Sequence, residues 1–358
     1  MKMRNVLCLA GLLGVAVRPA PAQPARVSNA NVRAHSASQG VQPVIEELTR
    51  RGEGPAWAGW LVPARKDARA CCWSPDSSDN PGCCGGCRLA KRGADAHAGD
   101  ANGTALAVGR QPVALDERAD LLILLRLEAG SVEQVRFFSR DCPLDAGGAE
   151  LHWLDDVKPA DSVAALAALV PAARGALAAI AHHAGPAADV ALEDLVQPGH
   201  PSKVRRDAAF WMGLARGSRG IETLLRLMSD DADQGFRKHL TFVLSQSKEV
   251  RALDALIAVA RNDPARRVRA QALFWLAQKA GRREVATIGE ALHSDPDIGI
   301  KKKAVFALSQ LPADEGVPLL IKTARSHGNR VVRQQALFWL GQSDDQRALA
   351  YIEEVLTR

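Results

Sequence analysis

The stretch VRAQALFWLAQKAG, residues 268–281, decides the fold, because the chain repeats its pattern four more times. The related stretches begin at Val204, Phe236, Ile300 and Val332, so that successive starts lie 32 residues apart. In each copy, apolar residues at the first, fifth and eighth or ninth positions form one stripe of a helix with 3.6 residues per turn. A second apolar stripe follows every time, which predicts two helices in each copy.

A unit of two helices in 32 residues is typical of an α-solenoid. A single helical hairpin cannot bury its apolar stripe alone, so neighbouring hairpins stack and share one continuous core. We therefore predict a mainly α fold, an α-α superhelix over residues 172–358. It comprises five clear repeats, preceded by a degenerate copy from about Ala172 that serves as a cap.

The repeat resembles the HEAT repeat, in the short form named after phycobilisome lyases. The resemblance rests on Asp263 before the first helix, the pair Val268–Arg269, the small residue Ala272 and the leucine Leu276. It extends over residues 204–358. The resemblance implies a solenoid that acts as a protein-binding scaffold.

The residues before each first helix predict where that helix begins. Asp263 and Asp295 each precede a proline, and a carboxylate before a first-turn proline is a typical helix N-cap. Asp231 holds the same place one copy earlier. In the fifth copy His327 stands at this position, and we expect Ser326 to cap the helix instead.

Three other columns recur with the same spacing. The second position is basic in all five copies, and we expect it to pair with the Asp before the first helix of a neighbouring repeat. The seventh position is always Phe, which we expect to pack between repeats, with an exposed aromatic ladder as the alternative. The eleventh position is Gln in four copies, which favours a hydrogen-bonded ladder of amides over a row of partner contacts. The columns are Arg205, Arg237, Arg269, Lys301 and Arg333; Phe210, Phe242, Phe274, Phe306 and Phe338; and Gln246, Gln278, Gln310 and Gln342.

The second helix of each copy carries the candidate partner-binding residues. In solenoids of this kind the second helices usually line the concave face, where partners bind. Charges of both signs and little apolar surface predict a polar contact with another protein. The candidates are Arg226, Arg261, His293, Lys322 and Arg325.

Residues 1–22 have the pattern of a cleaved secretory signal. A basic start, MKMR, precedes a 12-residue apolar run, and the small residues APA follow it, ending at Ala22. The apolar run is too short to anchor the chain in a bilayer. We expect an exported bacterial protein that begins near Gln23, has no membrane anchor and is periplasmic or secreted.

The region between the signal and the repeats predicts a second, smaller domain. Residues 23–45 are polar and are expected to be a flexible lead-in. Residues 46–155 contain short stretches typical of strands, with a hairpin turn near Ala129, and predict a small β-rich domain. Residues 156–171 are expected to form a linker and a first helix. The strand-like stretches are AWAGWLVPA, TALAVG, LLILLRLE, VEQVRFFS and AELHWL.

Six cysteines follow the signal, all of them in this β-rich domain. An even number in an exported chain favours structural disulfides. Two alternatives stay open. The CGGC stretch at Cys84–Cys87 has the spacing of thiol–disulfide exchange sites, and the same pair, completed by Cys71 or Cys72 and Cys142, would bind zinc. The six residues are Cys71, Cys72, Cys83, Cys84, Cys87 and Cys142.

The sequence gives little support to an enzymatic or a nucleic-acid-binding function. A net charge of +6 is typical of a solvated face, so we expect no nucleic-acid partner. The chain has no His-Glu dipeptide, the iron-binding pair of HEAT-type deoxyhypusine hydroxylases, and it resembles phycobilin lyases in the repeat alone. No nucleotide-binding loop, Gly-x-Ser-x-Gly or His-Glu-x-x-His motif occurs, and His182–His183 is expected at the surface. We therefore predict a non-enzymatic protein without a cofactor.

Overall fold

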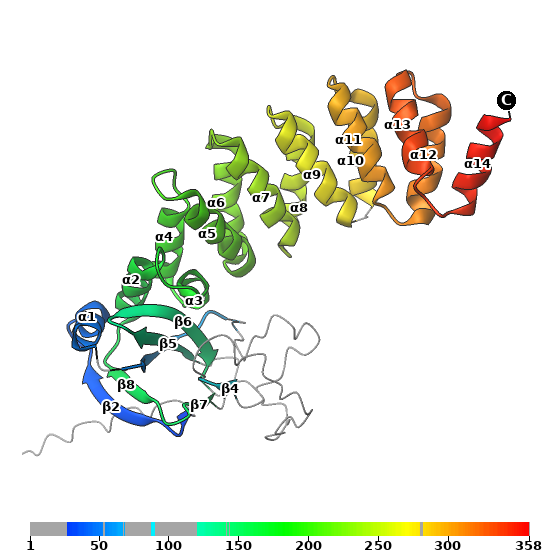
Figure 1. The fold of residues 1–358 in the computed structure, drawn as a ribbon. Helices are drawn as coiled ribbons and strands as arrows, with labels where there is room; N and C mark the ends of the chain where they lie inside the picture. Colours follow the sequence, from blue (N-terminus) through cyan, green and yellow to red (C-terminus); the bar gives the residue numbers. More distant parts are fainter. Residues whose placement is uncertain are drawn as a thin grey trace, which may run out of the picture.

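A small sheet domain followed by a long row of helices makes up the protein (Figure 1). The computed structural model describes residues 27–52, 54–66, 68, 87–89, 120–140, 142, 144–279 and 282–357. The predicted mainly α solenoid with a small β domain in front of it is confirmed.

The sheet domain contains a five-stranded sheet of order β2-β8-β3-β5-β6. Its first three strands run parallel to one another, whereas β5 is antiparallel to both β3 and β6. A smaller sheet has the order β1-β7-β4. The strands are β1 (Val27–Ser28), β2 (Asn31–Ser36), β3 (Ala56–Pro63), β4 (Cys87–Arg88), β5 (Asp120–Glu128), β6 (Ser131–Ser139), β7 (Leu144–Asp145) and β8 (Glu150–Asp155).

Four of the five predicted strand stretches are confirmed, as β3, β5, β6 and β8. The fifth, residues 104–109, lies outside the described residues. The predicted hairpin turn joins β5 to β6 through Ala129 and Gly130, whose φ angles are 51° and 76°. Positive φ at both central residues is the conformation of the turn that matches the twist of a two-residue hairpin.

The prediction of a flexible lead-in over residues 23–45 is wrong for the described part of that segment. β2 pairs in parallel register with β8 along its whole length, and helix α1 (Val41–Arg51) follows it. The polar sequence of β2 misled the prediction, because β2 is an edge strand whose side chains are mostly exposed. Backbone hydrogen bonds to β8 hold it, and such bonds leave no trace in the apolar pattern.

Both faces of the five-stranded sheet are buried. The seven residues between Asp120 and Glu128 in β5 are all buried, as expected for a near-continuous apolar run in a strand covered on both sides. One face packs against α1 and the helices that follow the sheet, and Trp60 and Ile123 lie in this core. The other face forms a second core with the small sheet, in which Trp57 and Leu144 lie.

After the sheet, the described residues form a row of separate helices, α2 to α14, joined by short connections (Figure 1). The pairs α5/α6, α7/α8, α9/α10, α11/α12 and α13/α14 are the five predicted repeats, and α3/α4 is the degenerate copy. We call the first member of each of the five pairs a first helix and the other a second helix. The helices are α2 (Pro159–Leu169), α3 (Ala176–His182), α4 (Pro186–Leu195), α5 (Ser202–Ala215), α6 (Gly217–Asp230), α7 (Gln234–Gln246), α8 (Val250–Asn262), α9 (Arg266–Lys279), α10 (Arg282–Ser294), α11 (Ile298–Ser309), α12 (Ala313–Ser326), α13 (Arg330–Leu340) and α14 (Gln346–Leu356).

The first helices begin two or three residues later than the sequence predicts. Asp233 and Asp297 are the N-caps of α7 and α11, and each accepts a backbone N–H from the residue two positions on. The predicted cap Asp263 forms a tight turn before the helix, because it accepts the N–H of Ala265. Ser326 does not cap α13 either: its hydroxyl donates to the carbonyl of Lys322. The N-cap of α13 is Asn329, which accepts from Val331 N at 2.9 Å.

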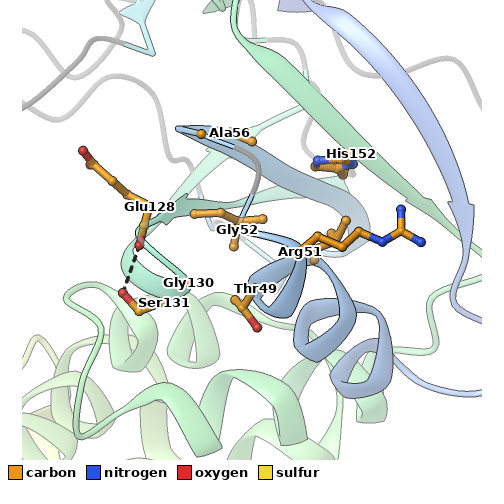
Figure 2. Close-up of a pocket in the computed structure, with 11 residues that line it drawn as sticks. Thr49, Arg51, Gly52, Ala56, Glu128, Gly130, Ser131 and His152 are labelled. Atoms are coloured by element: carbon orange, nitrogen blue, oxygen red, sulfur yellow. Dashed lines mark hydrogen bonds between the residues drawn. The ribbon is translucent and has the colours of Figure 1, made fainter.

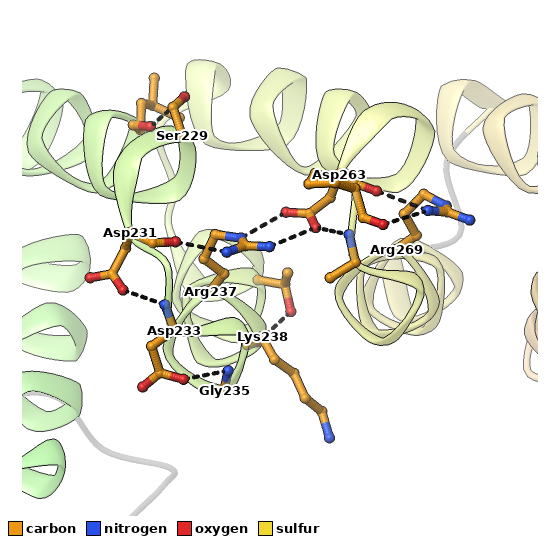
Figure 3. A network of polar contacts seen from close by, with 12 residues as sticks. Ser229, Asp231, Asp233, Gly235, Arg237, Lys238, Asp263 and Arg269 are labelled. Carbon is orange, nitrogen blue, oxygen red and sulfur yellow. Dashed lines mark hydrogen bonds and ion pairs between the residues drawn. The ribbon is translucent and has the colours of Figure 1, made fainter.

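The predicted pairing of the basic column with the Asp column is confirmed in the first three repeats. Arg237 Nε donates to Asp263 Oδ2 at 3.1 Å, and its Nη1 donates to the carbonyl oxygen of Asp231 at 2.7 Å (Figure 3). One buried guanidinium thus ties the loop before its own helix to the loop before the next first helix. The corresponding pairs are Arg205–Asp231 and Arg269–Asp295.

The ladder of Arg–Asp pairs stops at the fourth repeat. Lys301 occupies the basic column there and donates to the carbonyl of His293 at 2.7 Å. His327 occupies the Asp column and reproduces the turn, since its Nδ1 accepts from Asn329 N at 3.1 Å. That leaves the proton on Nε2, which donates to the carbonyl of Leu292 at 3.2 Å. A lysine and a histidine therefore replace the Arg–Asp ion pair at this point of the ladder.

Backbone hydrogen bonds fasten the sheet to the chain around α3. They join the C-terminal end of β3 and the middle of β6 to residues at the two ends of α3. Gly175 makes this contact close: its φ is +88°, and a Cβ at this position would overlap the carbonyl oxygen of Val135. The bonds are Arg65 N to His182 O, Ala184 N to Pro63 O, and Val135 N to Arg174 O, at 2.8–2.9 Å.

A buried polar chain adds to this junction. Trp60 Nε1 in β3 donates to Ser162 Oγ in α2 at 2.8 Å, and that hydroxyl donates to His183 Nε2 at 2.8 Å. His183 Nδ1 in turn donates to the carbonyl of Ala179 at 2.7 Å. The expectation that His183 lies at the surface is wrong, since its exposed fraction is 0%. Burial lowers the pKa of His183 to about 4, and the charge of Arg216 lowers it further, whereas the hydrogen bond to the carbonyl of Ala179 acts in the opposite direction.

Candidate functional site

The predicted binding residues on the second helices are largely engaged with one another. Arg261 in α8 pairs with Glu290 in α10 at 2.7 Å, and Arg325 in α12 pairs with Glu354 in α14 at 3.0 Å. The ring of His293 stacks on that of buried His327 from the next repeat, with centroids 5.6 Å apart. Burial lowers the pKa of His293, and the charges of neighbouring groups lower it further. These three candidates therefore serve contacts between second helices.

Arg226 and Lys322 are the two predicted residues that stay exposed without an ion pair among the described residues. They stand in corresponding positions of α6 and α12, three repeats apart. Lys322 and Arg325 line an open hollow beside Arg347 at the end of the solenoid. The structure thus brings two of the five candidates together and leaves Arg226 far along the row.

The two sets of helices carry very different charge, a feature that our sequence reasoning missed. Within the bounds of the five first helices lie fourteen Lys and Arg and a single acidic residue, Asp207. The five second helices carry nine Lys and Arg and nine Asp and Glu. The whole basic excess of the repeats therefore resides on the first helices. Counting charges for each predicted helix, instead of for the whole region, would have found it.

Phe and Trp rings run from one first helix to the next, as predicted for the Phe column. Phe210 and Phe242 stack with centroids 6.0 Å apart and planes 5° apart, and Phe242 contacts Trp275 at 5.2 Å. Phe274 and Phe306 form the next stack at 6.3 Å. Phe210, Phe242, Phe274 and Phe306 are half-buried, and each contacts a ring of the following repeat. Phe338 in the last first helix is 55% exposed.

The Gln column does not form a hydrogen-bonded ladder, so that prediction is wrong. Gln246 donates to Ser245 and Gln310 donates to Ser309, each the residue before it. All four glutamines are exposed. No hydrogen bond joins two of these glutamines among the described residues. The alternative, a polar row available to a partner, is the one compatible with this exposure.

The cysteine region is described only in part. Cys71, Cys72, Cys83 and Cys84 lie outside the described residues. The backbone of Cys87 lies in β4 and pairs in register with Leu144 of β7, two residues beyond Cys142. Cys142 is buried in the second core of the sheet domain. Strand pairing thus brings the chain segments of Cys87 and Cys142 side by side. The disulfide, zinc and redox hypotheses for the cysteines stay predictions.

A small pocket opens between the end of α1 and the β5–β6 hairpin (Figure 2). It has room for about one water molecule. Its hydroxyl groups are engaged with backbone: Ser131 Oγ donates to Glu128 O at 3.1 Å, and Thr49 Oγ1 donates to Ile45 O at 2.9 Å. His152 lines the pocket and its Nδ1 lies 2.9 Å from Nε2 of His35. We find no activated nucleophile in this arrangement.

Within the described ranges, no three His, Cys, Asp or Glu side chains gather in a way that would hold a metal ion. Among the same residues, none of the helices has the length and apolar character that crossing a bilayer requires.

Comparison with known proteins agrees with the repeat pattern. Residues 188–277 and 285–358 match the family model of HEAT repeats. A search of curated proteins gave no match.

Part of the chain also matches solved structures, three examples of which have low TM-scores. Human deoxyhypusine hydroxylase in complex with glycerol is 16% identical, with 55% of this chain and 90% of that chain covered and a TM-score of 0.28. The complex of CpcE and CpcF of phycocyanin lyase from Nostoc sp. PCC7120 is 24% identical. The match covers 43% of this chain and 99% of that chain, with a TM-score of 0.33. The Escherichia coli protein YibA is 24% identical. The match covers 47% of this chain and 64% of that chain, with a TM-score of 0.31.

Similarity at this level carries no information about activity, substrate or partner. The matched family and the observed stack of helical pairs agree on the architecture. The chain is therefore similar to HEAT repeats over residues 188–277 and 285–358, which are somewhat less than half of its length.

Proposed function

We propose that the protein is a non-enzymatic scaffold that binds another protein through its HEAT repeats. The observation that carries the proposal is the periodic surface of the solenoid. Exposed amide and basic side chains recur on successive first helices at a constant sequence interval, while the buried polar groups are used to stack the repeats. A row of evenly spaced polar groups suits an elongated partner better than a small substrate.

The non-enzymatic part of the proposal is supported by how the buried polar groups are engaged. His183 donates and accepts within a chain of hydrogen bonds, and its side chain is fully buried. Arg237 and its counterparts are bound to carboxylates and carbonyls in the loops. Such groups hold structure together and leave no free base or nucleophile in these places.

Photo-cross-linking tests the scaffold proposal. A photoreactive amino acid is placed at Gln278 on a first helix, at Arg226 on a second helix and at Glu47 on α1 as a control. We expect one protein species to be captured from the native host at a solenoid position, and the purified chain to rebind that species in a fixed stoichiometry. Capture at none of the solenoid positions, or at the control position with equal yield, would refute the scaffold.

We further propose that the scaffold acts outside the cytoplasm, in the periplasm or after secretion. The basic and apolar leader and the cysteine content support this. Intact mass spectrometry of the protein purified from its native cell, with and without reductant, tests it. We expect the mass of a chain starting near Gln23 and a gain of two hydrogens for each bridge on reduction. A full-length mass with no response to reductant contradicts the proposal.

The cysteine cluster supports a second candidate function, as a zinc-binding or redox site. The favourable observation is the pairing of β4 with β7, which sets the backbone of Cys87 beside the segment that follows Cys142. The variant Cys84→Ser/Cys87→Ser distinguishes the candidates. Normal folding with loss of bound zinc or of thiol-exchange activity favours the second function. Failure to fold favours structural disulfides.

A further inference from the structure

We propose that the first-helix face of the solenoid is the binding surface, and that it takes an extended acidic peptide segment of the partner. By first-helix face we mean the exposed side of α5, α7, α9, α11 and α13. It carries the Phe and Gln columns and a basic row, Arg206, Lys238 and Lys302, which is distinct from the basic column that pairs with the Asp residues. This inference rests on the proposed scaffold function and specifies its surface and the chemistry of its partner.

Charge is the first argument for an acidic partner. The single acidic residue of the first helices, Asp207, is paired with Lys203 at 2.6 Å. Arg206, Lys238 and Lys302 are exposed and make no ion pair with any residue that the structure describes. They occupy the same position in the first, second and fourth repeats, so they form one row. A row of unneutralised cations attracts a chain of carboxylates and repels a basic one.

The arrangement of the three rows is the second argument. The Phe column lies four residues after the basic row, and the Gln column lies four residues after Phe. The second and fourth repeats carry all three rows, whereas Leu214, Ala270 and Gln334 interrupt them in the other repeats. Side chains four residues apart share a helix face, so cations, ring edges and amides lie side by side. Lys303, next to the basic row, places its Nζ 5.8 Å from the ring centre of Phe306. A glutamine amide offers both a donor and an acceptor, which matches a peptide backbone unit.

The state of the rings distinguishes an acidic peptide from single-stranded nucleic acid. Binding of unpaired bases uses free aromatic faces as stacking platforms. Here Phe210 stacks on Phe242 and Phe274 stacks on Phe306, so ring faces meet each other. What they leave for a partner is the ring edge, which carries partial positive charge. Ring edges between cations favour carboxylates over bases.

The spacing of the repeats sets the length of the segment. Packed helices lie about 8–10 Å apart, and each first helix contacts the next. An extended chain advances about 3.3–3.6 Å per residue, so about three peptide residues correspond to one repeat. A segment of about twelve residues spans the five first helices.

Fluorescence anisotropy with the full chain tests the inference. The probe is a labelled peptide of about twelve residues with Glu at every third position, and the reference is the same peptide with Gln in place of Glu. We expect the Glu peptide to bind at least about tenfold more tightly at low salt, and its affinity to fall as salt is raised. Equal affinity for the two peptides overturns the inference, and so does tighter binding of an oligothymidylate or of anionic lipid vesicles.

Two matched variants locate the surface. Arg206→Gln/Lys238→Gln removes one Arg and one Lys from the first-helix face, and Arg226→Gln/Lys322→Gln removes the same charges from the second helices. All four side chains are exposed, so both variants should fold, as circular dichroism checks. We expect the first variant to weaken Glu-peptide binding about tenfold and the second to change it less than twofold.

The outcome also separates this inference from the scaffold proposal. If only Arg226→Gln/Lys322→Gln weakens the peptide, and cross-links form at Arg226, the scaffold stands and the assigned face is wrong. If neither variant changes binding, the acidic-peptide inference is refuted. Loss of cross-linking at every solenoid position refutes the scaffold itself.

Discussion

The guanidinium of Arg237 contacts two successive loops at once. It binds the carboxylate of Asp263 and the carbonyl of Asp231, and both contacts are buried. The hydrogen bonds to Asp263 raise the pKa of Arg237 above its usual value. A charge removed from water in this way stabilises the fold only while its partner is present. The ladder therefore makes each repeat dependent on the next.

Arg237→Ala is expected to lower the free energy of unfolding by about 3 kcal/mol, because Asp263 would keep a buried charge without its partner. Arg333 is the matched control. It donates to the carbonyls of His327 and Gly328 and makes no ion pair with any residue that the structure describes. Arg333→Ala is expected to cost about 1 kcal/mol. Urea unfolding followed by circular dichroism measures both. Equal losses would show that the Asp partner contributes nothing.

His183 makes the junction sensitive to acid. Its folded pKa of about 4 lies below the ordinary value of 6.5, so the stabilising contribution of the neutral ring is complete above pH 6.5 and is lost as pH falls toward 4. Between pH 7.5 and pH 5 this one group should lower the free energy of unfolding by about 2 kcal/mol. His183→Gln should show a pH dependence smaller by that amount. Parallel stability curves for the two proteins between these pH values contradict the prediction.

At the scale of the element, the first and second helix of a repeat approach closely where a glycine begins the second helix. Gly316 in α12 is such a position, because a Cβ there would overlap the carbonyl oxygen of Leu308 in α11. The same position is glycine in α6 and alanine in α8, so the distance between the paired helices is adjusted repeat by repeat.

Gly316→Ala is expected to destabilise the protein by about 1–3 kcal/mol, since the two helices must separate to admit the methyl group. Gly289 in the interior of α10 has open space around it, so Gly289→Ala should instead stabilise by about 0.5–1 kcal/mol through helix propensity. Thermal unfolding of the two variants beside the parent gives the comparison. Opposite signs are expected, and two changes of the same sign would contradict the close approach.

At the scale of the whole molecule, the sheet and the solenoid are joined as one body. Backbone bonds connect β3 and β6 to the segments around α3, and the chain Trp60–Ser162–His183 lies buried between them. One apolar core runs from Trp60 in β3 to Tyr351 in α14. The sheet domain therefore works as a folded cap on the first repeats, covering apolar surface that the degenerate copy could not bury alone.

Ser162→Ala is expected to destabilise the sheet domain and the start of the solenoid together. It leaves Trp60 Nε1 and His183 Nε2 buried without a partner, at a cost of about 1–3 kcal/mol in the free energy of unfolding. Native-state hydrogen exchange should show lower protection of β3 and of α3 by similar amounts. Ser309→Ala in α11 serves as the control, since that hydroxyl bonds only within its own turn and to Gln310. Loss of protection in α3 with β3 unchanged would mean that the junction does not couple the two.

The sequence by itself determined the repeat architecture, since a column of Phe, a column of small residues and a basic column at one interval dictate which face of each helix is buried. It also determined the partners of Arg237 and its counterparts. Four of the eight described strands, β3, β5, β6 and β8, could be predicted for the same reason, because many of their side chains are buried. β2 could not, because edge-strand pairing uses backbone groups that are alike in every residue.

Only the tertiary structure decided which side chains are available. The same sequence pattern allowed the glutamines to bond to each other or to stay free, and in the structure all four are exposed, with Gln246 and Gln310 bonded to the serine before them. It allowed His183 to lie at the surface, and the approach of β3 buried it. Periodicity reports which residues of a helix face inward, whereas exposure and pairing depend on what a neighbouring element brings to the same place.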